Sequence, residues 1–227
     1  MNPTPPSIVF DLDGTLVDTA PDLAAAMNHV LAHFGRPAVD PEAVRHMVGH
    51  GARRTIERGL ALTGGGDEAM LDVGVPVFLE YYGANVCVGS RPWEGVAASL
   101  AALSDAGGRL AICTNKPERL AIDLIDALGW GDLFDAILGG DSLPVRKPHP
   151  AHVLETLARM GGDPARAAFV GDSRPDVEAS RAAGLPVVLT SFGYSDVPPD
   201  TLGADAMIDH FDALVPTLKR VAPALFV

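Results

Sequence analysis

The sequence predicts an α/β protein with a Rossmann-like parallel sheet as its core and a helical cap domain inserted into that core. Short apolar runs alternate with amphipathic stretches along most of the chain, a pattern typical of a parallel sheet covered by helices. A long segment after the first apolar run contains no convincing strand. The 227 residues are enough for one large domain with such an insertion.

Five short apolar runs predict the strands of the sheet, because each ends near Gly, Asp, Thr or Pro. They are Ile8–Phe10, Leu110–Thr114, Ala136–Leu138, Ala168–Val170 and Val187–Leu189. Helices are expected between the later runs, where apolar residues recur every three or four positions. The segments with this helical character are Val96–Leu103, Leu120–Leu128, Val153–Met160 and Asp176–Ala183.

The insertion is predicted to span residues 18–91, which leaves residues 1–17 and 92–227 for the core domain. A structureless segment of that length would be unusual in a compact protein, so we expect a helical lobe. Thr19, Asp40 and Asp67 are each predicted to begin a helix as its N-cap. Pro76 should break or kink the helix that contains it, because proline lacks the N–H that a helix interior needs.

The charge balance of the chain excludes two classes of partner. Asp and Glu number 29 and Lys and Arg number 17, so the formal net charge is 17 − 29 = −12. Binding to nucleic acid or to an anionic membrane relies on excess positive charge, so neither is expected. The same balance raises the question of how an acidic protein could hold an anionic substrate. A bound cation would solve that problem.

Cysteine content and the N-terminal residues predict a cytoplasmic protein. Cys87 and Cys113 are the two cysteines, too few for a disulfide framework, which favours a reduced compartment. The first residues lack the basic and apolar regions of a signal peptide. No apolar stretch approaches the ~18 residues that a membrane span requires. We expect a monomer or homodimer acting on a small metabolite.

Two acidic residues follow the first predicted strand. Asp11 and Asp13 are two positions apart, so in extended chain their side chains point the same way. Open α/β sheets bind ligands at the carboxyl ends of their strands, which is where this pair lies. Two carboxylates so close together repel each other, and a cation nearby would relieve that repulsion. A solvated turn is the alternative reading of this motif taken alone.

Polar residues also follow the next predicted strands. Thr114 and Asn115 offer a hydroxyl and main-chain N–H groups at the start of a helix, which suits a phosphate oxygen. Lys147 lies in a loop stiffened by two prolines. Asp172 and Asp176 follow the fourth strand, and with Asp11 and the main-chain carbonyl of Asp13 they could form an oxygen-ligand Mg²⁺ site. Simple helix capping is the alternative for Thr114 and for the two acids.

The order of these motifs resembles the haloacid dehalogenase-like hydrolase superfamily. Its four motifs match Asp11 and Asp13, Thr114, Lys147, and Asp172 and Asp176, and the resemblance covers nearly the whole chain. Shorter segments are similar to the phosphoglycolate phosphatase branch of that superfamily. These segments are residues 10–18, 114–117, 139–141, 147–150 and 171–176.

The resemblance implies a Mg²⁺-dependent phosphatase whose insertion is the family's cap. Asp11 would attack phosphorus and form an aspartyl-phosphate, and Asp13 would act as general acid and then as general base. Thr114, the N–H of Asn115 and Lys147 would hold the phosphoryl oxygens. The metal would be held by Asp11, Asp13, Asp172 and Asp176.

The choice of substrate is expected to come from the inserted lobe, because the core motifs recognise only the phosphoryl group. The segment Gly49–Arg54 combines two glycines, which permit a tight turn, with Arg53 and Arg54. We expect these arginines to bind a carboxylate close to the substrate's phosphate, and 2-phosphoglycolate fits that description. Solvated helix residues are an equally weighted reading of both arginines.

Three other functions stay open from the sequence. A sugar phosphate mutase or a broad-specificity sugar phosphatase would share the same motifs. A phosphonate hydrolase of this superfamily needs a lysine in its cap, and the first lysine of this chain is Lys116, beyond the insertion. A non-catalytic binding or regulatory protein with the same fold is the alternative from another class, and the intact acidic motifs argue against it.

Overall fold

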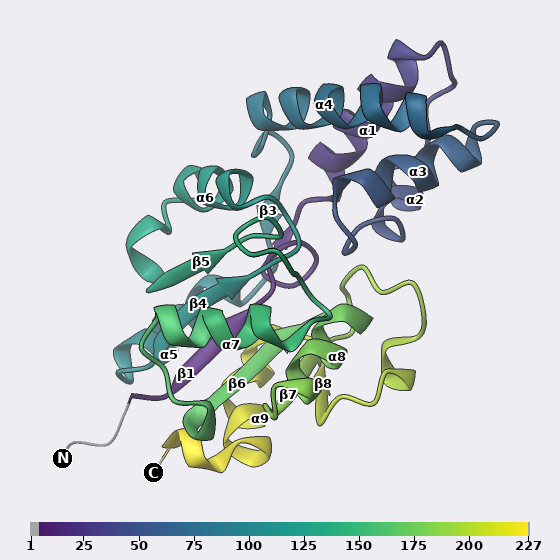
Figure 1. Cartoon of the computed structure of the whole chain (residues 1–227). Coiled ribbons are helices and arrows are strands. Elements are labelled where there is room, and N and C mark those ends of the chain that lie inside the picture. The colour runs from purple at the N-terminus through teal and green to yellow at the C-terminus, as the bar shows by residue number, and fades with distance from the viewer. Residues whose placement is uncertain (1–4, 227) are drawn as a thin grey trace.

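A parallel sheet forms the centre of the computed structural model, which describes residues 5–226 (Figure 1). Within that range six strands pair in the order β5-β4-β1-β6-β7-β8, all in parallel. The strands are β1 (Ser7–Phe10), β4 (Arg109–Cys113), β5 (Ala136–Leu138), β6 (Ala167–Gly171), β7 (Val187–Thr190) and β8 (Ala206–Ile208). The parallel sheet and its α/β class are therefore confirmed, and the sequence analysis missed only the short edge strand β8.

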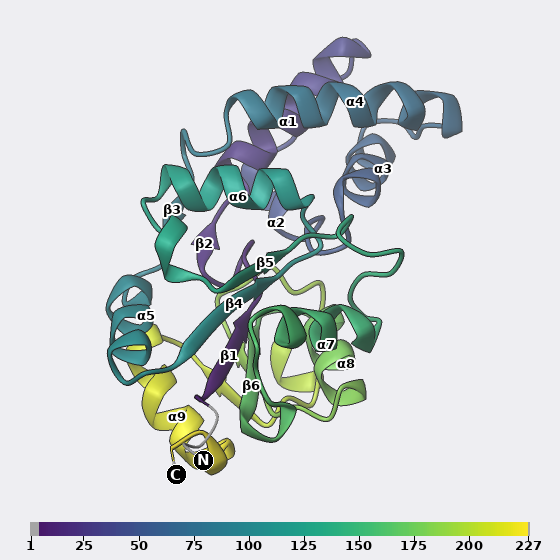
Figure 2. The ribbon, with the colours of Figure 1, turned by 60° about the vertical axis from the view of Figure 1, so that its left-hand side comes forward.

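Helices cover both faces of the sheet, and β1 shows how its residues divide between them. Ile8 and Phe10 pack with the helices of one face, whereas Val9 packs with those of the other. The first face carries α5 (Val96–Asp105), α6 (Glu118–Ala127) and α9 (Leu214–Val221). The second carries α7 (Pro150–Arg159) and α8 (Arg174–Ala182) (Figure 2). Short 3₁₀ turns lie at Gly131–Leu133, Pro164–Arg166, Pro199–Thr201, Phe211–Ala213 and Pro223–Phe226.

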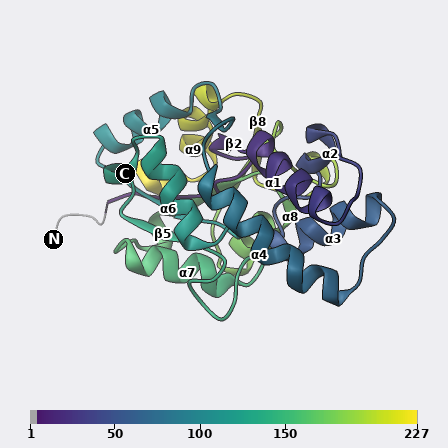
Figure 3. The ribbon, with the colours of Figure 1, turned by 90° about the horizontal axis from the view of Figure 1, so that it is seen from above.

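A separate lobe of helices lies over the carboxyl ends of the central strands (Figure 3). It consists of α1 (Ala20–His33), α2 (Pro41–Arg45), α3 (Ala52–Leu62) and α4 (Glu68–Ala84). Met27, Ile56 and Phe78 are buried in its own apolar core. The chain enters and leaves the lobe through β2 (Val17–Asp18) and β3 (Arg91–Pro92), which pair antiparallel. We take this pair as the boundary between core and cap.

The start of α1 differs from the expectation. Thr19 is the N-cap residue, but its backbone is helical (φ −97°, ψ −3°) and its side chain makes no capping hydrogen bond. Asp22 in the first turn instead accepts hydrogen bonds from the returning chain. Its carboxylate receives the N–H of Gly89 at 2.7 Å, and the N–H and hydroxyl of Ser90 at 2.8 and 2.6 Å. This buried carboxylate ties the two crossings between the lobes together.

The other expected helix starts are confirmed, but the helix does not break at Pro76. Asp40 caps α2 and Asp67 caps α4 through their side chains. Helix α4 continues through Pro76, although a proline in a helix interior costs about 3 kcal/mol. The burial of Leu71, Phe78 and Tyr82 in the lobe's apolar core offsets that cost. Across residues 5–226, no helix has both the length and the apolar character that a membrane crossing demands.

Candidate active site

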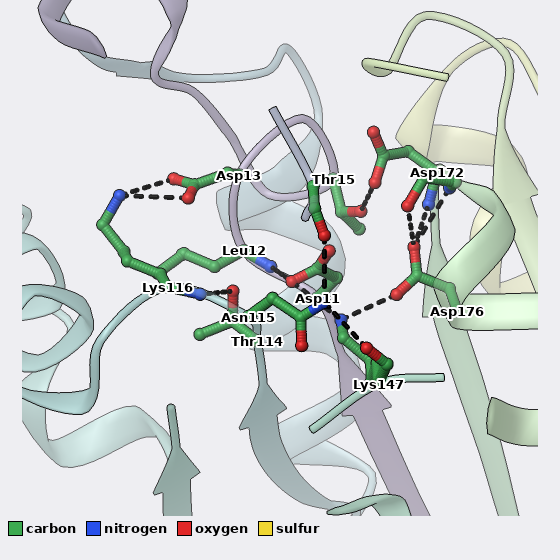
Figure 4. Close-up of polar contacts among 12 residues, drawn as sticks. Asp11, Leu12, Asp13, Thr15, Thr114, Asn115, Lys116, Lys147, Asp172 and Asp176 are labelled. Atoms are coloured by element: carbon green, nitrogen blue, oxygen red, sulfur yellow. Dashed lines mark hydrogen bonds and ion pairs between the residues drawn. The ribbon is translucent and has the colours of Figure 1, made fainter. Parts of the chain in front are cut away.

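The polar side chains predicted from the sequence meet at the carboxyl ends of the central strands (Figure 4). Asp11 follows β1, Thr114 follows β4 and Asp172 follows β6, and these three strands are neighbours in the sheet. Lys147 reaches the same point from the loop between β5 and α7, and Asp176 from the first turn of α8. The side chains of Asp11, Lys147, Asp172 and Asp176 are buried.

Asp11 is held at the centre of this group. Its Oδ1 accepts the N–H of Leu12 at 2.7 Å and lies 3.0 Å from Nζ of Lys147. Burial raises the pKa of Asp11 to about 6; the charge of Lys147 opposes this rise and the charge of Asp176 adds to it. The environment therefore disfavours the charged form of the residue that the sequence analysis predicts to be the nucleophile.

Asp176 organises its neighbours through both carboxylate oxygens. Oδ1 lies 2.7 Å from Nζ of Lys147. Oδ2 accepts the N–H groups of Asp172 and Ser173 at 3.1 and 3.0 Å and the hydroxyl of Ser173 at 2.9 Å. Burial would lower the pKa of Lys147, but the carboxylates of Asp11 and Asp176 reverse this and hold it above its ordinary value. Lys147 is therefore a permanent cation between two acids.

Asp172 faces the same point from the other side and is fixed by two residues that the sequence analysis missed. The hydroxyl of Thr15 donates to its Oδ1 at 3.0 Å, and the main-chain N–H of Tyr194 donates to its Oδ2 at 2.6 Å. Burial, with the nearby charges of Asp176 and Asp11, raises the pKa of Asp172 well above its ordinary value. Thr15 belongs to the Asp-Leu-Asp-Gly-Thr motif, whereas nothing in the sequence around Tyr194 indicates this contact.

The three buried carboxylates form a site that fits a hard divalent cation. Oxygens of Asp11, Asp172 and Asp176 lie within 4.8 Å of one another. Lys147 is the cation that opposes them, so the cluster holds more negative than positive charge. Burial, with repulsion from neighbouring carboxylates, raises the pKa values of Asp11 and Asp172, so the protein alone disfavours their charged forms. Carboxylate oxygens in this number suit Mg²⁺, which keeps its remaining positions for water and phosphate.

The side chain of Asp13 lies outside this cluster. Both of its oxygens are bound by Nζ of Lys116, at 2.8 and 3.0 Å, and the carboxylate points away from Asp172 (Figure 4). If Asp13 binds a metal, it therefore does so through its main-chain carbonyl, the group that the sequence analysis favoured. Asp13 instead lines the cavity between the sheet and the helical lobe.

Thr114 and Asn115 lie beside Asp11 on the wall of a cavity between the sheet and the helical lobe. The amide of Asn115 donates to the carbonyls of Gly49 at 2.9 Å and of Lys147 at 3.0 Å, so it joins the lobe to the core. Its main-chain N–H has no acceptor within residues 5–226. That N–H and the hydroxyl of Thr114 are available for a ligand oxygen.

The structure does not bring Arg53 and Arg54 to this cavity. Arg53 is paired with Glu68 and with Asp72, the latter at 3.1 Å, and Arg54 is paired with Glu57. All these partners lie on the cap's own helices, because the two arginines occupy the solvent side of α3. Gly49 and Gly51 from the same segment do line the cavity, whereas the two arginines do not.

A family model described as haloacid dehalogenase-like hydrolase matches residues 8–190. This chain belongs to that family. A phosphoglycolate phosphatase of Mesorhizobium japonicum is 47% identical over 220 residues, which cover 95% of each chain. One of Agrobacterium fabrum is 45% identical over 217 residues, covering 95% of this chain and 93% of the relative.

Solved structures of haloacid dehalogenase-like proteins have the same architecture. A predicted phosphoglycolate phosphatase from Haemophilus somnus superposes with a TM-score of 0.88 at 34% identity, covering 96% of this chain and 99% of its own. CbbY from Rhodobacter sphaeroides, solved in complex with phosphate, has a TM-score of 0.78 at 28% identity, covering 92% and 95%. The fold and the site therefore agree with membership of this hydrolase family.

Proposed function

We propose that this chain is a Mg²⁺-dependent phosphatase that hydrolyses 2-phosphoglycolate to glycolate and phosphate. The observation that carries the proposal is the buried acidic cluster around Asp11, with Asp13 two residues further on and facing the cavity. A nucleophilic carboxylate and a second acid on the leaving-group side are sufficient for covalent hydrolysis of a phosphate ester. The names of the two relatives described above favour 2-phosphoglycolate as the substrate.

The proposed metal site uses residues that the sequence analysis named. Asp11 and Asp172 would offer carboxylate oxygens, and Asp13 its main-chain carbonyl. Asp176 completes the acidic set and also holds Lys147 and the backbone at Asp172. When bound, Mg²⁺ would supply positive charge for the phosphoryl oxygens.

The proposed reaction has two steps, and the chain's own residues carry both. In the first, an oxygen of Asp11 bonds to phosphorus as the ester bond breaks, and Asp13 gives a proton to the departing alkoxide. In the second, Asp13 takes a proton from a water molecule that attacks the aspartyl-phosphate, which releases phosphate and restores Asp11. Lys147, the hydroxyl of Thr114 and the N–H of Asn115 would hold the phosphoryl oxygens throughout.

Phosphate release tests the proposal. With saturating Mg²⁺, wild type should show a higher kcat/KM for 2-phosphoglycolate than for glucose 6-phosphate. Asp11→Asn keeps the shape of the side chain but removes its attacking charge, so turnover should fall at least ~10³-fold. Asp105→Asn, an exposed change on α5, is the control and should keep wild-type turnover.

Each part of the proposal can fail separately. Ordinary turnover by Asp11→Asn would refute the covalent mechanism. Equal efficiency on both esters would reject 2-phosphoglycolate and favour a broad-specificity sugar phosphatase. Isomerisation of a sugar phosphate without phosphate release would identify a mutase, and no reaction on any ester would favour a binding protein.

A further inference from the structure

The cavity above Asp11 is lined by a lysine to which the sequence analysis assigned no role. Its walls from the lobe are largely apolar, with Leu23, Val48 and Phe78 among them. Within residues 5–226, Lys116 is the single lysine or arginine that lines this cavity. Its side chain is only 3% exposed. A buried ammonium group in an apolar pocket is costly unless anions or hydrogen-bond acceptors surround it.

The partners of Lys116 come from both lobes. Its Nζ donates to the two oxygens of Asp13, which belongs to the core, and to the hydroxyl oxygen of Tyr82 at 2.7 Å. Tyr82 lies in α4 of the cap and is almost fully buried. The ammonium group therefore sits at the point where the cap meets the general acid expected at Asp13.

Tyr82 has a hydrogen to donate. Its oxygen accepts from Lys116, and its own O–H has no acceptor in the described part of the chain. Burial, together with the charge of Asp13, raises the pKa of Tyr82 well above its ordinary value, so the phenol keeps its proton. Lys116 and Tyr82 thus present an ammonium group and a neutral O–H donor side by side, which is a suitable pair for an anionic oxygen.

The location of Lys116 and Tyr82 relative to Asp11 determines which part of the substrate they would contact. The phosphoryl group has to lie at Asp11, and the ester oxygen has to lie within reach of Asp13. Lys116 touches Asp13, so it stands next to whatever follows the ester oxygen in the leaving group. In 2-phosphoglycolate a single methylene separates that oxygen from a carboxylate.

We propose that Lys116 and the hydroxyl of Tyr82 bind the carboxylate of the substrate's leaving group and so select esters of short hydroxy acids. The inference rests on the proposed phosphatase function and names the residues of its substrate specificity. Lys116 shares its hydrogen bonds between Asp13 and the substrate when the carboxylate is present. The role expected of Arg53 and Arg54 then falls to a core lysine and a cap tyrosine.

The test compares two esters that differ only in the group at issue. 2-Phosphoglycolate carries a carboxylate, and 2-hydroxyethyl phosphate carries a neutral CH₂OH group at the same position. The measured quantity is the ratio of their kcat/KM values with saturating Mg²⁺. Wild type should favour 2-phosphoglycolate, and Lys116→Met should lower the ratio by roughly 10- to 100-fold, the range for a lost charged hydrogen bond. Most of the loss should appear as a higher KM for 2-phosphoglycolate.

Two further variants control the experiment. Tyr82→Phe removes one neutral donor and should lower the ratio roughly 3- to 10-fold. Lys219→Met makes the same change as Lys116→Met at an exposed position of α9 and should leave the ratio unchanged. Tyr82→Phe also keeps the inference testable if Lys116→Met does not fold, because it removes a single oxygen.

The outcomes separate the inference from the function on which it rests. If Lys116→Met and Tyr82→Phe lower kcat/KM equally for both esters, these residues act only on Asp13, and the inference is overturned while the phosphatase stands. If wild type hydrolyses neither ester, the proposed function fails. Calorimetric titration of wild type and Tyr82→Phe with glycolate then decides the carboxylate site: weaker binding to the variant supports it, and equal affinity refutes it.

Discussion

Acidification should weaken the fold through His152, a fully buried residue in the first turn of α7. Its Nδ1 accepts the main-chain N–H of Lys147 at 3.2 Å, so the imidazole is required in its neutral form. Burial, and next the charge of Lys147, lower the pKa of His152 to about 4 in the folded protein. Protonation of Nδ1 of His152 would place an N–H donor against the N–H donor of Lys147, and this hydrogen bond would be lost.

The size of the effect follows from that pKa. An unfolded chain has a histidine pKa of about 6.5, so between pH 6.5 and about 4 the unfolded state binds a proton that the folded state refuses. Stability is therefore complete above this window and falls as the pH falls through it. Between pH 7 and pH 5, His152 should remove about 2 kcal/mol from the free energy of unfolding.

The assay is urea unfolding of wild type and His152→Asn at pH 7 and pH 5. The asparagine oxygen can still accept a hydrogen bond but does not titrate, so the variant should lose about 2 kcal/mol less than wild type on acidification. Asp11 and Asp172, with raised pKa values, contribute the opposite sign, but they are present in both proteins and cancel in the comparison. His33→Asn changes an exposed histidine of α1 and should behave as wild type. An equal loss in wild type and His152→Asn would show that His152 is not the group responsible.

Three other changes test the site and the crossings between core and lobe. Chelation with EDTA should abolish phosphate release, and added Mg²⁺ should restore it. Ca²⁺ should bind but inhibit, because its looser coordination disturbs the in-line geometry. Full activity after exhaustive chelation would contradict the metal requirement. Gly193→Ala should raise the Mg²⁺ concentration needed for half-maximal activity, since its Cβ would overlap the Cβ of Asp172, and an unchanged Mg²⁺ titration would count against it. Asp22→Asn should lower the free energy of unfolding by about 2–3 kcal/mol, because its amide N–H₂ would face the donors of Gly89 or Ser90. Urea unfolding measures this loss, and Asp105→Asn is the control.

The parallel strands and their functional ends were predictable because both depend on local patterns. An apolar run followed by a polar residue identifies a buried strand and its carboxyl end, and this holds for Asp11, Thr114 and Asp172. Parallel pairing then brings those ends together without further information. Strand β8 escaped the sequence analysis although Ala206–Ile208 is also an apolar run of three residues; it forms the edge of the sheet, and Met207 is exposed there.

Contacts between segments far apart in the sequence were not predictable. Tyr194 supports Asp172 from a loop without regular secondary structure, and its sequence neighbourhood gives no indication of this role. For Arg53 and Arg54, charge and position in the sequence suggested a substrate contact, but the structure places both away from the cavity. Acids on the cap's own helices pair with both arginines, and sequence spacing does not show which side of α3 faces the cavity. Lys116 lies in segment 114–117, which the sequence analysis used for the family resemblance. The same analysis noted that this lysine is outside the cap, but assigned it no contact.

The local charge at the site explains how a protein with a net charge of −12 could bind an anionic ester. Asp11, Asp172 and Asp176 against Lys147 give a formal balance of 1 − 3 = −2, which a divalent cation would bring to zero. Asp13 and Lys116 form a second pair that is neutral by itself. A phosphoryl group would then approach a site that does not repel it. The acids on the outer surface lie in solvent, where salt screens charges beyond about 8–10 Å. Reversing a remote surface charge should therefore change affinity far less than removing Lys147, whose loss would leave the acidic cluster without its own cation.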